Sequence, residues 1–156
     1  MKSLVLPLAI FVGIPALIAL TRCHGDLTGK SDGGPPVFTH QTVSEAKAAV
    51  AGTNRILVVK GTAAWCPPCK EMDRTTWRDP KVEKWFADNG IVIALDVDQS
   101  VADAKALRIM AMPTMVAFKG DVEFDRVMGY QDAEELLGWL NGVKAGKQHG
   151  GAPETK

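Results

Sequence analysis

A Cys-Pro-Pro-Cys segment between a strand pattern and a helix pattern constrains the fold of this chain more than any other feature. The segment occupies residues 66–69, with Trp65 before it and Lys70 after it. An aliphatic run at residues 56–59, rich in β-branched side chains, predicts a buried strand just upstream. Residues 66–77 predict a helix that begins at the segment. A Cys-x-x-Cys pair at such a strand–helix junction indicates redox chemistry in an α/β domain.

The middle of the chain alternates helix and strand patterns on both sides of this segment. The predicted helices cover Val43–Val50, with Thr42 or Ser44 as cap, and residues 66–77, 79–86, 101–107 and 131–143; the predicted strands cover residues 56–59, 91–97, 114–118 and 122–127. Strands separated by helices pair in parallel, whereas the last two strands flank a Lys119-Gly120-Asp121 turn and form an antiparallel hairpin. The sequence therefore predicts an α/β fold with a central mixed β-sheet and helices on both faces.

The positions of the two cysteines suit thiol–disulfide exchange. Cys66 stands at a predicted helix N-terminus, where unpaired N–H groups and the helix dipole stabilise a thiolate over a thiol. The thiolate is the attacking species, so Cys66 is the candidate nucleophile, and Cys69, one turn later, can resolve the mixed disulfide. Pro67 and Pro68 cost little in the first turn, whose N–H groups have no intrahelical partner, and they stiffen the ring formed on oxidation.

Metal binding is an alternative use of a Cys-x-x-Cys pair. A tetrahedral zinc site needs a second pair of ligands, and His24, His40 and His149 lie in terminal or poorly structured stretches. Cu(I) transfer by the reduced pair is a weaker alternative, because the sequence indicates no methionine or histidine companion nearby. A purely structural disulfide is the remaining one. We predict no metal and no cofactor beyond the redox-active Cys66–Cys69 disulfide, since no phosphate-binding glycine motif occurs either.

An uncharged apolar run precedes the domain. It covers residues 4–20, between Lys2 and Arg22, and as a helix it would extend roughly 26 Å, just short of a membrane hydrocarbon core. We expect residues 1–22 to form a membrane anchor or a cleaved signal peptide, with the anchor favoured, and the domain to be extracytoplasmic on the periplasmic side. Cys23 is a free thiol, a lipidation site or a partner in an intermolecular disulfide.

Composition bounds the domain and its partners. Residues 26–36 are rich in Gly, Pro and small polar side chains, and the end of the chain has no periodic apolar pattern. We therefore expect a flexible linker at residues 23–39, one folded domain at residues 40–143 and a disordered tail at residues 144–156. The 18 basic and 18 acidic side chains give a formal net charge of zero, which provides no reason to expect a nucleic-acid partner.

Residues 40–143 resemble the thioredoxin superfamily. The resemblance is carried by AAWCPPCKEMDRTTWRDPKVEKWF at residues 63–86, which is most similar to the C-terminal thioredoxin-like domain of the bacterial thiol:disulfide interchange protein DsbD and to related single-domain proteins. The Thr-Trp-Arg-Asp-Pro-Lys-Val part of this stretch distinguishes it from compact cytosolic thioredoxins. The resemblance implies a thioredoxin fold and thiol–disulfide oxidoreductase activity.

The resemblance also implies roles for residues outside the Cys pair. Met112-Pro113-Thr114 matches the family segment in which a proline follows a cis peptide bond and packs against the active-site disulfide. Pro113 would then shape a substrate groove, and the Met112 backbone would pair with a substrate segment in strand fashion. Trp65 would flank the active site. The other large aromatic side chains are expected in the core: Trp77, Trp85, Phe86 and Trp139.

Lys60 departs from the family pattern. It stands six residues before Cys66, where many members carry a buried Asp that moves protons to and from the second cysteine. Ala94 replaces the lysine that commonly accompanies that Asp. Lys60 either extends its ammonium to solvent, which we favour, or lies near Cys69, stabilises its thiolate when charged and accepts its proton when neutral.

These features predict a thiol–disulfide oxidoreductase in which Cys66 attacks disulfides of partner proteins and an upstream thiol donor reduces the chain again. The DsbD resemblance favours a protein-disulfide reductase acting on extracytoplasmic proteins. A disulfide donor, the oxidase direction, is the alternative, because direction depends on reduction potential. A non-catalytic thioredoxin-like binding module is an alternative of another class, and it predicts that Cys66→Ser preserves partner binding and function.

Overall fold

The computed structural model describes residues 34–149. The predicted membrane segment, Cys23 and most of the predicted linker lie outside the described residues, as do residues 150–156 of the predicted tail. Within residues 34–149, no helix has the length and apolar character needed to cross a membrane.

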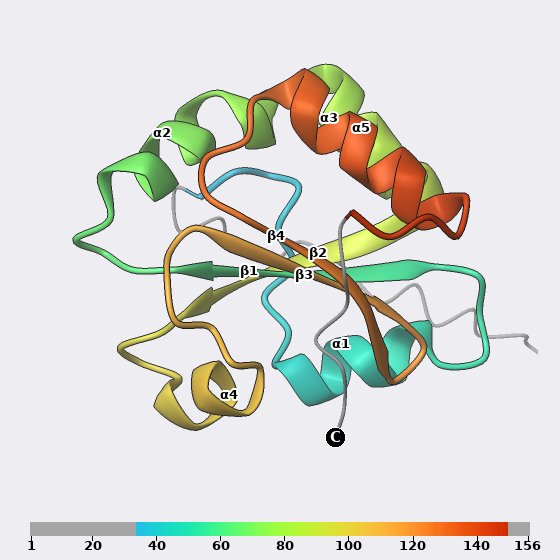
Figure 1. The fold of residues 1–156 in the computed structure, drawn as a ribbon, viewed down its shortest axis with the longest axis horizontal. Helices are drawn as coiled ribbons and strands as arrows, with labels where there is room; N and C mark the ends of the chain where they lie inside the picture. Colours follow the sequence, from blue (N-terminus) through green and yellow to red (C-terminus); the bar gives the residue numbers. More distant parts are fainter. Residues whose placement is uncertain (1–33, 150–156) are drawn as a thin grey trace, which may run out of the picture.

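The centre of the fold is a four-stranded mixed sheet (Figure 1). Its strands are β1 (Ile56–Thr62), β2 (Gly90–Asp96), β3 (Thr114–Lys119) and β4 (Val122–Met128), in the spatial order β2-β1-β3-β4. β1 pairs in parallel with β2 and antiparallel with β3, and β4 forms an antiparallel hairpin with β3. The predicted mixed sheet with a final hairpin is confirmed.

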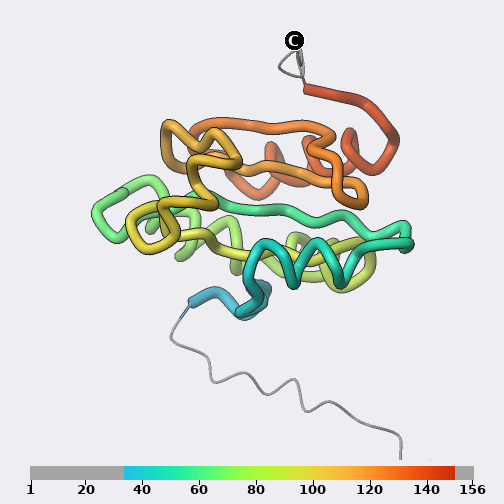
Figure 2. Tube along the Cα trace, turned by 90° about the horizontal axis from the view of Figure 1, so that it is seen from below, coloured from blue at the N-terminus to red at the C-terminus, as the bar shows by residue number. Residues whose placement is uncertain are grey.

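Helices cover both faces of the sheet, as predicted. One face carries α2 (Pro67–Arg74), the 3-10 helix η1 (Thr76–Arg78), α3 (Pro80–Asn89) and α5 (Ala133–Lys144), whereas the other carries α1 (Val43–Val50) and α4 (Val101–Ala106) (Figure 1). Figure 2 looks onto the face that carries α1 and α4. The fold is the three-layer arrangement expected from the alternation of elements.

β1 is buried on both faces because two hydrophobic clusters meet across it. Ile56 and Val58 belong to the cluster beneath α3 and α5, while Leu57 and Val59 belong to the cluster beneath α1 and α4. Alternate side chains of a strand point to opposite faces, so a strand covered on both sides needs the continuous aliphatic run seen in the sequence. Lys60 continues the alternation toward the side of Val58, where Trp77 also lies.

Reciprocal hydrogen bonds cap two helices. The Thr42 hydroxyl at the start of α1 accepts from Glu45 N at 3.3 Å, and the Glu45 carboxylate accepts from Thr42 N at 2.8 Å. The hydrogen bonds from Thr42 lower the pKa of Glu45. Asp132 and Glu135 form the same capping box at α5. Of the two caps predicted for α1, Thr42 is the one observed.

The structure divides the helix predicted over residues 66–77 into two. α2 ends at Arg74, and Thr75 separates it from η1 with φ −118° and ψ −78°. The Thr75 hydroxyl donates to Glu71 O at 2.8 Å, which satisfies a carbonyl in the last turn of α2. The break turns Trp77 into the core, where it is fully buried.

Segments predicted as linker and tail pack against the sheet. Phe38 bridges to Val92 of β2, and Thr39 N donates to Val92 O at 2.9 Å. At the other end, His149 N donates to the buried carboxylate of Asp125 at 2.8 Å. The Phe38 ring also packs on Trp77, with ring centroids 5.1 Å apart. The folded part of the chain thus extends past the predicted boundaries at residues 40 and 143.

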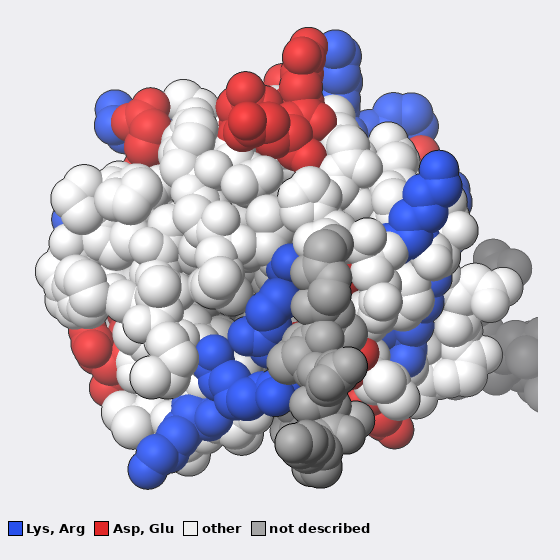
Figure 3. All heavy atoms as spheres, in the orientation of Figure 1, with Lys and Arg blue, Asp and Glu red and all other residues white. Residues whose placement is uncertain are grey.

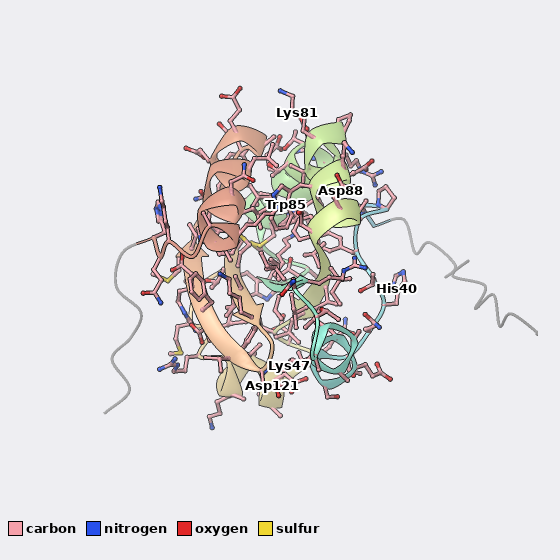
Figure 4. All side chains as sticks on the ribbon, turned by 90° about the vertical axis from the view of Figure 1, so that its right-hand side faces the viewer. His40, Lys47, Lys81, Trp85, Asp88 and Asp121 are labelled. Carbon is pink, nitrogen blue, oxygen red and sulfur yellow. A yellow bond between two sulfur atoms is a disulfide. The ribbon has the colours of Figure 1, made fainter. Side chains whose placement is uncertain are left out.

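Polar contacts also join helices to neighbouring elements (Figure 4). Trp85 Nε1 of α3 donates to Asn141 Oδ1 of α5 at 2.9 Å, and Lys47 Nζ of α1 donates to Asp121 O in the β3–β4 turn at 3.4 Å. The four aromatic side chains predicted in the core are buried: Trp77, Trp85, Phe86 and Trp139.

Candidate active site

The junction of β1 and α2 places Cys66 at a helix N-terminus. Cys66 is the N-cap of α2, and Pro67 and Pro68 occupy the first two helical positions. The Cys66 Sγ accepts a hydrogen bond from Cys69 N at 3.3 Å. A backbone N–H and the positive end of the helix dipole both stabilise a thiolate at this sulfur. The predicted position of Cys66 is confirmed.

Cys66 and Cys69 form a disulfide, with their Cα atoms 5.3 Å apart. Cys69 is 0% exposed and Cys66 is 3% exposed. Cys66 is therefore the less buried of the two residues, although both belong to the core. This difference matches the roles predicted for an attacking and a resolving cysteine.

Apolar side chains enclose the disulfide. Cys66, Cys69 and Ala63 form a small buried cluster, and Val97 and Met112 pack against it. The sequence indicated no methionine near the pair, and this expectation is wrong, because the chain returns after α4 and packs Met112 against this cluster. Within residues 34–149, no group of three or more His, Cys, Asp or Glu side chains could hold a metal ion.

The loop before β3 carries a cis peptide bond between Met112 and Pro113, as the family resemblance implies. Pro113 is buried, and its main-chain oxygen accepts from Gly129 N at 2.8 Å. The Thr114 hydroxyl donates to Ala111 O at 2.7 Å and ties the loop to the start of β3. The loop is therefore fixed on both sides beside the Cys pair.

Trp65 lies next to Cys66 and is held by an acidic partner that the sequence analysis did not identify. Its side chain is 63% exposed, and its Nε1 donates to Asp98 Oδ2 at 2.7 Å. Asp98 follows β2, and its main-chain N–H donates to Asp96 Oδ1 at 2.9 Å. The indole is therefore an oriented surface group and does not belong to the core.

Exposed apolar side chains flank the loop that contains Pro113. Met110 is 89% exposed and Met128 is 65% exposed, and Met128 is the strand partner of Thr114. Tyr130 follows with 42% exposure. Figure 3 shows a broad area with few charged side chains on the side of the molecule where α2 and α4 lie.

Lys60 is buried, so the favoured prediction that its ammonium reaches solvent is wrong. Its side chain is 0% exposed, and Nζ donates to Asp73 Oδ1 at 2.5 Å and to Cys69 O at 3.4 Å. Burial lowers the pKa of Lys60, whereas its hydrogen bond and charge interaction with Asp73 raise it. Lys60 is also the strand partner of Ala94, the position that carries the companion lysine in the family pattern.

Asp73 is the second site residue that sequence reasoning missed. It lies four residues after Cys69 on α2, and side chains with that spacing share a helix face. This spacing is the signal that could have found it. No family motif marks the position, and its partner Lys60 comes from another element.

The comparisons with known proteins agree with this geometry. The sequence profile of the family described as Thioredoxin matches residues 37–142. The thiol:disulfide interchange protein DsbD of Escherichia coli K12 is 33% identical over 107 residues, which cover 64% of this chain and 19% of the relative. A thioredoxin of Echinococcus granulosus is 35% identical over 89 residues, which cover 56% of this chain and 77% of the relative. The chain thus corresponds to less than a fifth of the length of that DsbD protein.

A solved structure extends the likeness to the fold. The thioredoxin from Thermus thermophilus superposes with a TM-score of 0.60 and 25% sequence identity over 69% of this chain and 87% of the other. The residues matched by the sequence profile, 37–142, include the Cys pair, the cis-proline loop and all four strands of the sheet. The chain therefore belongs to the thioredoxin family.

Proposed function

We propose that this chain is a thiol–disulfide oxidoreductase in which Cys66 attacks and Cys69 resolves. The observation that carries the proposal is the disulfide at the N-terminus of α2, in which Cys66 is the N-cap residue and the less buried of the two cysteines. Membership of the thioredoxin family and the likeness to DsbD support this activity.

The proposed reaction transfers two electrons from the Cys pair to a partner disulfide. The Cys66 thiolate attacks one partner sulfur; a Cys66–partner S–S bond forms, the partner S–S bond breaks, and the other partner sulfur leaves as a thiolate. Cys69 then loses its proton and attacks Cys66 Sγ. The Cys66–Cys69 disulfide forms, and the first partner sulfur leaves as a second thiolate.

We further propose that the partner segment binds across the loop containing Met112 and Pro113. The Met112 backbone would pair with an extended segment of the partner, while Pro113 fixes the shape of the loop. Trp65 would border the other side of Cys66, where its hydrogen bond to Asp98 orients the ring. The exposed side chains of Met110 and Met128 support an apolar contact with the partner.

The proposed direction is reduction of disulfides in extracytoplasmic proteins, with an upstream thiol donor that restores the dithiol. The likeness to DsbD, a thiol:disulfide interchange protein, and the apolar run at residues 4–20 support this assignment. For a reductase, we expect the Cys66–Cys69 pair to have a reduction potential of about −270 mV, as in thioredoxin. A value of about −120 mV, as in DsbA, would instead indicate a disulfide donor.

Turnover with a protein disulfide tests the activity itself. The full chain, with an external dithiol as donor, should reduce the disulfides of a model protein over many cycles. Cys66→Ser should abolish turnover and Cys69→Ser should stop it after the first attack, while Cys23→Ser serves as the cysteine-removal control. Full activity of Cys66→Ser would contradict the proposal, and partner binding without turnover in the wild type would favour the binding-module alternative.

A further inference from the structure

α4 ends in a left-handed turn that leads directly into the loop before β3. Ile109 N donates to Ala104 O at 2.9 Å. Arg108 N donates to Lys105 O at 3.1 Å, which completes a Schellman motif. Arg108 has φ +52°, and within residues 34–149 it is the one non-glycine residue with a positive φ. Glycine is usual at this position, and another residue persists there only when its surroundings hold it.

Arg126 of β4 holds this turn. Its guanidinium donates from Nη2 to Leu107 O at 3.1 Å and from Nη1 to Arg108 O at 3.3 Å. Carbonyl groups at the C-terminus of a helix have no intrahelical partner and lie at the negative end of the helix dipole, so a cation is a favourable donor to them. The Arg126 side chain is only 18% exposed, so the guanidinium is enclosed between β4 and the end of α4.

Glu123 fixes the guanidinium from the same strand. Its Oε1 accepts from Arg126 Nε at 2.7 Å and lies 2.6 Å from Nη2. Its Oε2 lies 3.5 Å from Arg108 Nη2, so the carboxylate joins both arginines. We call the Arg126 and Glu123 side chains, together with the carbonyl groups of Leu107 and Arg108, the Arg126 clamp.

An irregularity in β4 makes this pairing possible. Residues three apart on a regular strand point to opposite faces of the sheet. In β4, however, Asp125 pairs with Ala117 while Glu123 pairs with Phe118, so the strand carries one extra residue between them. The shift in register brings Glu123 to the face of Arg126, whereas Asp125 points to the opposite face, where it accepts from Trp139.

The turn held by the Arg126 clamp is continuous with the loop beside the disulfide. Ile109 is buried, and a Cβ at Gly61 of β1 would lie 2.7 Å from Ile109 Cγ2, so this side chain packs directly on the β1 backbone. Met110 follows with 89% exposure, and Met112 packs against the cluster that contains the disulfide. The clamp and the Ile109 contact therefore fix the chain just before the two methionines.

We propose that Arg126 and Glu123 are positioning residues for partner binding, an inference that rests on the proposed function. They keep the Met112 backbone and the Met110 side chain in the arrangement that receives an extended segment of the partner. A loop that is fixed before binding loses less entropy when the partner docks. The hydrogen bonds of the Arg126 side chain go to the turn and to Glu123, so the clamp acts on the loop and leaves the chemistry of the sulfurs unchanged.

Two disulfides of different size separate these effects. The reduced full chain is mixed with a peptide disulfide, whose chains extend on both sides of each cysteine, or with bis(2-hydroxyethyl) disulfide, which has no segment to lie across the loop. Arg126→Leu should lower the second-order rate constant for the peptide about tenfold, as when the binding-competent loop falls to about a tenth of the population. The rate constant for the small disulfide and the reduction potential of the Cys pair should match the wild type.

Arg55 provides the matched control. It donates from Nη2 to Gly90 O at 2.6 Å, at the end of β1 opposite to Cys66. Arg55→Leu should follow the wild type with both disulfides. Arg126→Lys, which keeps the charge without the forked donor, should give an intermediate peptide rate. Glu123→Gln should also lower the peptide rate selectively, so the test remains available if Arg126→Leu does not fold.

The pattern of losses decides the outcome. A loss confined to the peptide disulfide supports the inference. Equal losses with both disulfides, a loss with the small disulfide alone, a changed reduction potential, or no loss with either would overturn it. A wild type that reduces neither disulfide would overturn the proposed function instead.

Discussion

Lys60 links the chemistry of single residues to the stability of the fold. Its pKa in the folded chain is lowered from 10.5, mainly by burial, so the folded state binds fewer protons than the unfolded state between its folded pKa and 10.5. Stability rises with pH wherever the unfolded state binds more protons. The charged Lys60 therefore costs stability at lower pH, and this cost disappears as the pH rises toward 10.5.

This linkage predicts a pH-dependent effect of Lys60→Met. The free energy of unfolding of the variant minus that of the wild type should fall as the pH rises through the folded pKa of Lys60 toward 10.5. Urea unfolding of both proteins over this range measures the difference. The same comparison for Lys84→Met, whose side chain is 77% exposed, should stay flat. A constant difference for Lys60→Met would contradict the prediction.

Removing the partner of Lys60 should have the opposite effect on stability. Asp73→Asn leaves the buried ammonium without its carboxylate, and because Asp73 is 33% exposed we expect a loss of about 2 kcal/mol, below the roughly 3–5 kcal/mol of fully buried pairs. The double variant Lys60→Met, Asp73→Asn should recover most of that loss. Denaturant midpoints measure both, and an unchanged midpoint for Asp73→Asn would refute this account of the pair.

The burial of Lys60 could not be predicted from the residues of β1 alone. The alternation of β1 gives the face on which Lys60 lies, but whether a helix covers the end of that face depends on how α2 and η1 are placed. Cys66, Pro113 and Trp65 could be found because motifs mark them. Asp98 could not, because its partner Trp65 comes from another part of the chain. For Asp73, the spacing from Cys69 was the one available signal, because its partner Lys60 lies on another element.

At the scale of elements, the start of β2 depends on the close approach of two backbones. A Cβ at Gly90 would lie 2.2 Å from Ile56 O on the neighbouring strand, whereas a Cβ at Gly138 in α5 would have no atom within 4 Å. Gly90→Ala should therefore cost about 1–3 kcal/mol through overpacking. Gly138→Ala should stabilise α5 by roughly 0.5–1 kcal/mol, because alanine loses less entropy in a helix. Thermal or urea unfolding measures both, and equal effects of the two substitutions would contradict this difference in packing.

The order of the elements was predictable because each element has a periodic apolar pattern or a capping residue. The break in the helix after Arg74 was not predictable, since no residue between 66 and 77 interrupts the helical pattern. It arises from the conformation of Thr75 and the burial of Trp77, which are properties of the packed state.

At the scale of the whole molecule, the fold brings the loop before β3 to the junction of β1 and α2, which is distant from it in the sequence. The end of β1 supplies Lys60, the start of α2 supplies Cys66 and Cys69, and the loop before β3 supplies Met112 and Pro113. Sequence motifs identified each segment, and the family resemblance implied that the segments lie close together in the fold. The packing of residues 37–39 and 144–149 was not predicted, because these short segments have no periodic apolar pattern, although Val37 and Phe38 pack against the core.

The layered architecture predicts a gradient of local stability. Amide hydrogens of β1, which is covered on both faces and paired on both sides, should exchange at the rate set by global unfolding. Amides at the sheet edge near Phe38, which is tied to β2 by an isolated bridge, should exchange faster. Hydrogen exchange resolved by residue measures this gradient, and equal protection of β1 and the segment around Phe38 would be inconsistent with it.

The central claim is that Cys66 is the attacking sulfur of a dithiol enzyme, and trapping of the covalent intermediate tests it most directly. The reduced Cys69→Ser chain is incubated with a peptide disulfide, and the products are mapped by mass spectrometry. The account predicts one peptide adduct, on Cys66, that persists because the resolving thiol is absent; Cys66→Ser should give none at the Cys pair. An adduct on Cys69 in Cys66→Ser that forms as fast as the Cys66 adduct, or no adduct on Cys66 in Cys69→Ser, would contradict the claim.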